Sequence, residues 1–430
     1  MSVMSLANAL HPDFAYRWLY IDFNSYFASV EQQLEPQLRG KPIAVVPVQT
    51  DSTCAIAASY EAKAFGVKTG TPIYEAKKMC PGLICVLAQH ERYVDYHHRI
   101  LKEVDHHIPV TMVCSIDEVA CQLMGNEQSL ERITQIASSI KQGLAKNVGE
   151  YVKCSIGAAP NRYLAKVATD LKKPDGFTLL NVPDLPGRLL DLNLRDLPGI
   201  GPNMEKRLRM AGINDMKALW ALEPKRMRTI WGSVWGEKIW YFLRGYDLPD
   251  EETTRSTIGH SHVMAPELRD PAKARYVARR LTLKAASRLR RMGYYASSFH
   301  LSARIENGPR IADDERCYRA QDSVTFLRLL DTAWTKVMRE ARGARIKKVS
   351  ISLHGLTAVD DTQPELFSEL PDIDMKAREK SEKMSRAMDK INQRFGRDSV
   401  LVGMLPSQGR SFSGSKIAFT RIPDVEEFLE

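Results

Sequence analysis

Residues 18–34 read WLYIDFNSYFASVEQQL, and they hold the change from strand to helix on which the fold prediction depends. The apolar run Trp18–Phe23 predicts a short buried strand. Residues 24–34 then predict a helix, because apolar side chains recur along one side of it. The strand carries Asp22 to its end, so we expect an acidic side chain at the edge of a buried sheet.

A second apolar stretch, residues 113–123, predicts another strand and contains the acidic pair Asp117 and Glu118. Burial of an uncompensated carboxylate is costly, so three such groups that converge in a sheet usually neutralise a cation. Ligation by oxygen alone selects a hard ion such as Mg²⁺. Adjacent side chains of a strand point to opposite faces, so Asp117 and Glu118 must lie at a turn or bulge if both are to reach metal.

Two such ions, about 3.5 to 4 Å apart, would activate a primer 3′-hydroxyl, bridge a triphosphate and stabilise the leaving pyrophosphate. The chemistry indicated is nucleotidyl transfer. These three residues taken alone support a second interpretation equally well, in which none of them binds metal. In it, the Asp117–Glu118 pair lies at a hairpin tip and Asp22 caps the following helix.

Farther along the chain, the pattern divides into three parts. Strands and helices alternate up to about residue 180, which predicts an α/β sheet covered by helices. Residues 189–245 are wholly helical in pattern, and the polar stretch that follows reads as a tether. The last part opens with a helix signalled by Asp270 as N-cap, Pro271 at the first position and Gly293 past the end. Strands at 299–305 and 349–356 with a helix between them, and an amphipathic helix at 381–396, complete the prediction.

Composition narrows the class of protein. The 430 residues carry a formal net charge of +9, which favours a polyanionic partner. Seven cysteines without a C-x-x-C pair argue against a zinc site or a disulfide framework. No window is apolar enough to span a membrane, and the N-terminal run lacks the features of a secretory signal. We therefore expect a cytoplasmic protein with no membrane partner.

The excess positive charge is concentrated in residues 255–310. This segment holds twelve Lys and Arg against three acids, and twelve minus three equals the +9 of the whole chain. Such concentration is typical of a domain that grips a nucleic-acid duplex. The candidate DNA contacts within it are Arg279, Arg280, Lys284 and Arg288.

Four runs together resemble the Y-family DNA polymerases: DFNSYFASVEQ, SYEAKAFGVKTGTPIYEAKK, SIDE and SIGAAPNRYLAKVATDLKKPDG, in this order. The resemblance extends from about residue 20 through TIGHSHV at 257–263, and more faintly to residue 356. It implies a multidomain α/β (α+β) fold of the right-hand type. The implied parts are a palm (1–32 and 85–180), small fingers (33–84), a helical thumb (181–246), a tether (247–256), an α/β little finger (257–358) and a C-terminal tail (359–430).

The resemblance also implies the site residues. Asp22, Asp117, Glu118 and the backbone carbonyl of Phe23 would hold two Mg²⁺ ions. Ser25 and Tyr26 would form part of the triphosphate cradle at a helix N-terminus, and Phe27 would be the steric gate that excludes ribonucleotides. Tyr60, Lys63 and Lys166 would contact the phosphates. The chain departs from many members in having Ala57 for Thr and Lys63 for Arg, which removes a hydroxyl and a bidentate fork and predicts weaker nucleotide binding.

Two further motifs concern partners. LPGIGPNMEKRLRMAGI resembles a helix-hairpin-helix in which Gly199 and Gly201 let backbone N–H groups approach a phosphate, with Lys206 nearby. QPELF in the tail resembles the peptide by which bacterial polymerases dock on the sliding clamp, with Gln363, Leu366 and Phe367 as its contacts.

The resemblance implies a DNA-directed polymerase of the translesion type, with small fingers, an open active site and low fidelity. Its expected partners are primer-template DNA, deoxynucleoside triphosphates, the sliding clamp and, as further candidates, other mutagenesis proteins. One alternative is a catalytically weak, polymerase-like accessory protein of a mutagenic repair complex, although such relatives typically lack the acids retained here. Another is a nucleotide cyclase with a similar palm, against which the basic segment and the helix-hairpin-helix argue.

Overall fold

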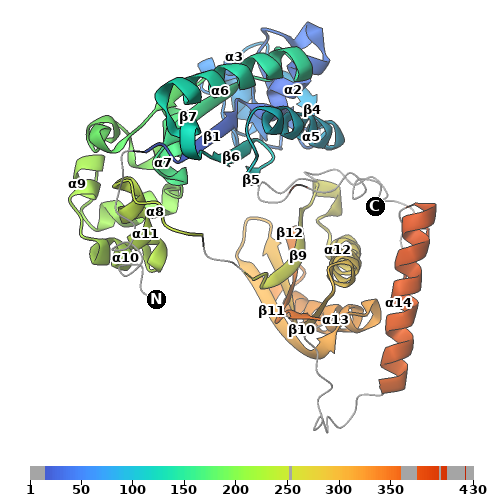
Figure 1. Ribbon diagram of the computed structural model, residues 1–430. Coiled ribbons are helices and arrows are strands. Elements are labelled where there is room, and N and C mark those ends of the chain that lie inside the picture. Colours follow the sequence, from blue (N-terminus) through green and yellow to red (C-terminus); the bar gives the residue numbers. More distant parts are fainter. Residues whose placement is uncertain (1–14, 251–253, 360–374, 397–398, 404–421, 423–430) are drawn as a thin grey trace. The chain divides into compact units, whose positions relative to one another are not determined.

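The computed structural model describes residues 15–250, 254–359, 375–396, 399–403 and 422 (Figure 1). The chain divides into two compact units after Asp250. Within the described ranges, no helix has both the length and the apolar character needed to cross a membrane.

A five-stranded sheet forms the centre of the first unit, in the order β5-β6-β1-β7-β8. Its strands are β1 (Trp18–Phe23), β5 (Met112–Ser115), β6 (Glu118–Gln122), β7 (Cys154–Ala159) and β8 (Phe177–Leu179). The central strand β1 is antiparallel to both neighbours, β6 and β7. Its continuous apolar run is explained by burial on both faces of the sheet.

Helices cover the two faces of this sheet and divide its core. On one face, Leu19 and Ile21 pack with α2 (Tyr26–Leu34), α5 (His90–His107) and α6 (Leu130–Gly143). On the other face, Tyr20 packs with α7 (Arg162–Leu171). Asp22 alternates with Ile21 and therefore lies on the side of α7.

Two smaller parts complete the first unit. A three-stranded sheet, β3-β2-β4, is built from β2 (Ile43–Val46), β3 (Ala57–Ala58) and β4 (Ile84–Leu87), with the short helices α3 (Tyr60–Ala64) and α4 (Ile73–Met79). The predicted all-helical region contains α8 (Pro202–Met210), α9 (Met216–Trp220), α10 (Pro224–Trp231) and α11 (Val234–Leu243). It shares a core with α7, where the Tyr163 and Phe242 rings stack with their centroids 5.7 Å apart.

The second unit is a four-stranded antiparallel sheet, β11-β10-β12-β9, with helices on one face. The strands are β9 (Thr257–Val263), β10 (Tyr294–Ile305), β11 (Arg310–Ala320) and β12 (Ile346–His354), and a short β13 (Thr357–Ala358) pairs with the start of β10. Helices α12 (Pro271–Arg291) and α13 (Ser323–Ala341) pack on its apolar face, and α14 (Met375–Phe395) packs against these two helices.

The structure corrects the sequence prediction at two strands. Residues 113–123 form a hairpin, because the chain turns at Ile116 and Asp117 between β5 and β6. Strand β11 was not predicted, since charged residues occupy most of its outward positions. The start of α12 is confirmed: the Asp270 side chain accepts hydrogen bonds from the N–H groups of Ala272 and Lys273. Its end is confirmed by Gly293, which has a φ of 68°.

Candidate active site

Two of the three predicted acids lie side by side on neighbouring strands. Asp22 on β1 is directly opposite Glu118 on β6 in the antiparallel register. The Asp22 side chain is buried and does not cap α2, whose N-cap residue Ser25 makes no side-chain cap bond either. The helix-cap alternative for Asp22 is therefore wrong, and its carboxylate is directed at side chains from α7.

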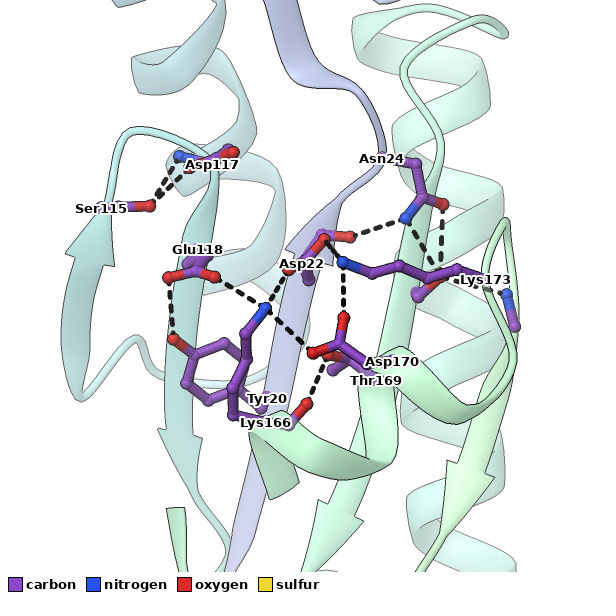
Figure 2. Close-up of polar contacts among 12 residues, drawn as sticks. Tyr20, Asp22, Asn24, Ser115, Asp117, Glu118, Lys166, Thr169, Asp170 and Lys173 are labelled. Carbon is purple, nitrogen blue, oxygen red and sulfur yellow. Dashed lines mark hydrogen bonds and ion pairs between the residues drawn. The ribbon is translucent and has the colours of Figure 1, made fainter. Parts of the chain in front are cut away.

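Asp117 occupies the turn of the β5–β6 hairpin, a position that agrees with the metal-site prediction and equally with the hairpin-tip alternative. Its backbone oxygen accepts from the N–H of Phe23 at 2.8 Å, which ties the turn to the end of β1. Its carboxylate accepts from the Ser115 hydroxyl at 2.5 Å and stands apart from the other two acids (Figure 2). Burial, with the negative charges of Glu118 and Asp22, raises the pKa of Asp117 to about 6, despite the Ser115 hydrogen bond.

Two lysines neutralise the Asp22–Glu118 pair. The Lys166 ammonium group bridges Asp22 and Glu118, and its Nζ lies 2.7 Å from Glu118 Oε1. The Lys173 Nζ lies 2.6 Å from Asp22 Oδ1 and 2.7 Å from Asp170 Oδ1, so Asp22 faces two positive charges (Figure 2). Burial acts to raise the pKa of Asp22, but Lys166 and Lys173 outweigh it and hold this pKa below its usual range.

The charge pattern suits a hard cation. Oxygens of Asp22 and Glu118 converge on one positive centre, the Lys166 ammonium, which stands in for a metal ion at that point. Among the described residues, no three acidic, His or Cys side chains are gathered closely enough to hold a metal as they stand. The donor set therefore fits Mg²⁺ in chemistry, but Lys166 must withdraw and Asp117 must leave Ser115 before three carboxylates can share an ion.

The residues predicted to bind the triphosphate surround the same carboxylates. Burial and the charge of Asp22 raise the pKa of Tyr60 to about 12. Burial and the neighbouring Lys173 lower the pKa of Lys63, whose Nζ lies 4.5 Å from the centre of the Tyr60 ring. The Ser25 hydroxyl is buried with no partner in hydrogen-bond geometry among the described residues, although it is near enough to influence the pKa of Tyr60.

The predicted steric gate is held firmly on α2. The Phe27 ring stacks on the Tyr93 ring of α5, with centroids 4.4 Å apart and planes 14° apart. The Tyr93 hydroxyl donates to the buried carboxylate of Glu31 at 2.5 Å, which fixes the ring against which Phe27 rests. The hydroxyl of Tyr26, in contrast, donates to the Tyr93 carbonyl at 2.6 Å and is directed into the protein.

Known proteins match this chain along most of its length. The impB/mucB/samB family matches residues 21–170, the DNA polymerase-iota thumb domain matches residues 195–247, and the impB/mucB/samB C-terminal domain matches residues 255–366. The DNA polymerase IV of Moorella thermoacetica is 32% identical over 394 residues, which are 88% of this chain and 93% of the relative. That of Pelotomaculum thermopropionicum is 32% identical over 401 residues, 89% of this chain and 94% of the relative.

This chain belongs to the Y family of DNA polymerases.

Solved Y-family structures share its fold. A Y-family DNA polymerase chimera of Dbh and Dpo4 matches with a TM-score of 0.66 at 22% identity, over 79% of this chain and 99% of the chimera. An insertion ternary complex of Dbh DNA polymerase matches with a TM-score of 0.52 at 23% identity, over 78% of this chain and 98% of that one. The predicted multidomain α/β polymerase fold is thereby confirmed.

In this Y-family polymerase, the predicted DNA contacts lie in both units. Gly199, with a φ of 87°, and Gly201 precede α8, and Lys206 is exposed on that helix. A cavity of about 310 Å³ at the start of α8 is lined by Gly201, Pro202, Asn203, Met204 and Arg207. The predicted contacts of the second unit, Arg279, Arg280, Lys284 and Arg288, are half-buried on α12.

Sequence reasoning missed two groups of residues. Lys173 and Asp170 belong to a run quoted for the family resemblance, but nothing in the local pattern pairs them with Asp22. The polar face of the second sheet was also missed, because its basic residues come from three strands. We use "polar face" for the side that carries Arg304, Arg310 and Lys348, which the strand registers align. The clamp-motif residues Gln363, Leu366 and Phe367 lie outside the described residues.

Proposed function

We propose that this polymerase joins deoxynucleotides to a primer at Asp22, Asp117 and Glu118, which, with the Phe23 carbonyl, would hold two Mg²⁺ ions. DNA-directed synthesis of the translesion type follows from membership of the Y family. When bound, the ions would activate the primer 3′-hydroxyl and offset charge on the triphosphate. The observation that carries the proposal is the convergence of Asp22 and Glu118 oxygens on one positive charge.

The surrounding cations would bind and orient the triphosphate. Burial acts to lower the pKa of Lys166, but the carboxylates of Asp22, Glu118 and Asp170 outweigh it and raise this pKa, so the ammonium group beside Asp22 stays protonated. Lys63 and the hydroxyl of Tyr60 lie in the electrostatic field of the same aspartate. The buried Ser25 hydroxyl, which has no hydrogen-bond partner among the described residues, offers a donor at the start of α2, where backbone N–H groups also favour phosphate.

Phe27 would select the sugar. One face of its ring is covered by Tyr93, so an incoming sugar can meet only the opposite face or the edge. Because Tyr93 is itself fixed by Glu31, the Phe27 ring cannot easily retreat from a 2′-hydroxyl. The preferred substrates would therefore be deoxynucleoside triphosphates.

The remaining parts would grip the DNA. We assign the five-stranded sheet to the palm, the three-stranded sheet to the fingers, α8–α11 to the thumb and the second unit to the little finger, with the boundaries expected from the sequence. Gly199, Gly201 and Lys206 would contact phosphate at the start of α8. On the second unit, Arg279 already donates to the Val402 carbonyl at 3.0 Å. We propose the polar face, on which the strand registers align Arg304, Arg310 and Lys348, as a further source of duplex contacts beside α12.

Partners and location complete the proposal. Residues 363–367 would dock on the sliding clamp, and other mutagenesis proteins are further candidate partners. We place the enzyme in the cytoplasm. A clamp pulldown that loses the protein when Leu366 and Phe367 are both changed to Ala would support the docking motif, and unchanged retention would refute it.

Primer extension tests the enzymatic proposal. The wild-type chain should extend primers on undamaged and abasic templates with Mg²⁺, and Asp117→Asn should abolish extension on both. Asp191→Asn changes an exposed aspartate of the same unit by the same atoms and should leave extension intact. Undiminished synthesis by Asp117→Asn would remove this residue from the reaction.

A further inference from the structure

The second lysine at the carboxylate cluster has no role in the function proposed above. Lys173 follows α7 and is only 29% exposed at its side chain. Its Nζ divides between two carboxylates, Asp22 at 2.6 Å and Asp170 at 2.7 Å. Lys166 has the same pair within reach, since its Nζ lies 3.7 Å from Asp170 Oδ2 (Figure 2).

Lys173 therefore contacts two carboxylates, and Lys166 contacts the same two together with Glu118. Asp22 is buried and would be a metal ligand, whereas Asp170 is one third exposed and lies beside it on α7. A divalent cation at Asp22 would repel both ammonium groups from that carboxylate. Asp170 already holds Lys173 from the other side, so Lys173 can give up Asp22 without losing every partner.

We propose that Lys173 is a positioning residue that occupies Asp22 in the nucleotide-free enzyme and yields it to the incoming divalent cation, with Asp170 retaining the displaced ammonium group. This inference rests on the proposed role of Asp22 as a metal ligand. Its consequence is that Lys173 weakens cation binding before nucleotide arrives. The enzyme thereby holds its buried acids neutralised, and cation affinity rises only when the competing lysines are drawn away.

Electrostatics gives the sign of the effect. Removing the Lys173 charge leaves Asp22 with one ammonium partner fewer, so the negative potential at the cation position increases. Removing a charge from solvent-exposed Lys172, the adjacent residue in the chain, changes the net charge equally but leaves Asp22 untouched. The pair Lys173→Met and Lys172→Met therefore separates a local exchange from a general effect of charge.

The test measures Mn²⁺ binding to the full chain in the absence of nucleotide. Binding is monitored by the loss of the electron paramagnetic resonance signal of free Mn²⁺. Lys173→Met should bind Mn²⁺ about fivefold or more tightly than wild type, because a unit charge has left the immediate surroundings of the ion. Lys172→Met should match wild type within about twofold. Lys173→Gln provides a second variant if Lys173→Met unfolds, with thermal melting as the check on folding.

The possible outcomes separate this inference from the proposed function. If the Lys173 variants bind Mn²⁺ no more tightly than Lys172→Met, the exchange does not occur and the inference is overturned. If Asp22→Asn leaves Mn²⁺ binding unchanged, Asp22 is not a ligand, and both the proposed metal site and the exchange are lost. Tighter binding in the Lys173 variants, removed again by adding Asp22→Asn, would establish the exchange.

Discussion

The two large sheets of this polymerase use charge in opposite ways. The five-stranded sheet brings its charges to one buried point, where Asp22 and Glu118 from adjacent strands meet Lys166 and Lys173. The four-stranded sheet spreads basic and hydroxyl groups, with the acid Asp314 opposite His300, over the polar face. There Arg310 donates to the Ser302 hydroxyl at 2.5 Å instead of meeting a buried acid.

The two arrangements of charge suit two different tasks. Chemistry at a triphosphate needs opposite charges held close together and away from water, where electrostatic interactions are strong. A grip on DNA needs many weak contacts, each of which can be lost at little cost, because the duplex is a repeating polyanion. The contrast predicts large effects from single changes in the first sheet and small ones in the second.

The largest effect is expected at Glu118. Glu118 is a proposed metal ligand, and its carboxylate lies 2.7 Å from the Lys166 ammonium group. Glu118→Gln removes this negative charge, so the rate of primer extension should fall about a thousandfold or more. Glu131→Gln, at an exposed position at the start of α6, is the matched control and should change the rate less than about twofold. If Glu118→Gln extends primers at a rate within tenfold of wild type, single charges at the five-stranded sheet do not have the large effect predicted.

The next effect concerns sugar selection. Phe27→Ala should lower the preference for deoxynucleotides over ribonucleotides by about a hundredfold, because it removes the ring that Tyr93 holds in place. Single-nucleotide insertion kinetics with matched dNTP and rNTP would measure the ratio. Phe65→Ala, an exposed ring in the same unit, should leave the ratio unchanged. Equal selectivity in Phe27→Ala and wild type would exclude Phe27 as the gate.

A third prediction concerns the effect of pH on a buried histidine beside the five-stranded sheet. His97 on α5 contacts the turn between β5 and β6, where its Nδ1–H donates to the Ile116 carbonyl at 2.8 Å. Burial lowers the pKa of His97 to about 4, below the value near 6.5 expected in the unfolded chain. Its neutral form is thus favoured by folding, and the associated stability is present above pH 6.5 and is lost as the pH falls towards 4.

The measurement is urea unfolding at pH 7 and pH 5. From pH 7 to pH 5, the free energy of unfolding of wild type should fall by roughly 1–2 kcal/mol more than that of His97→Gln, because glutamine cannot take up a proton. His98→Gln, on the exposed side of α5, should keep the wild-type dependence on pH. Equal losses in wild type and His97→Gln would show that this histidine does not titrate on unfolding.

The smallest effect is expected on the polar face. Arg304→Ala or Lys348→Ala should each weaken binding to primer-template DNA only a few-fold and reduce the slope of log affinity against log salt by about 1. Fluorescence anisotropy across a salt series would measure both quantities. Arg339→Ala, exposed on α13, is the control for a charge on the helical side of this unit. A salt slope that falls equally in Arg339→Ala would argue against the polar face.

Local signals made much of this fold predictable. The apolar run that ends at Asp22 specified β1, and Asp270, Pro271 and Gly293 marked the limits of α12. The need for Asp117 and Glu118 to lie at a turn followed from the alternation of side chains along a strand and is confirmed.

What could not be predicted depends on contacts between distant residues. Lys173 meets Asp22 across 151 positions, the difference between 173 and 22, and no local pattern encodes such a pair. Strand β11 contains four consecutive charged residues, 313–316, so the apolar alternation typical of a strand is missing there and its long pairing with β10 holds it in the sheet.

Helix α14, the last described helix, holds polar side chains of α12 and α13 in the second unit. On α14, Asp389 binds Arg290, whose guanidinium side chain is only 5% exposed, and Ser381 donates to Asp322 at the start of α13. A polypeptide cut before Met375 would keep strands β9 to β13 but would lose the Asp389 carboxylate, and among the described residues Arg290 would then donate to the Gln321 carbonyl and the Ser323 hydroxyl. Loss of one partner of a buried ion pair is unfavourable, so we expect α14 to stabilise the fold of the second unit.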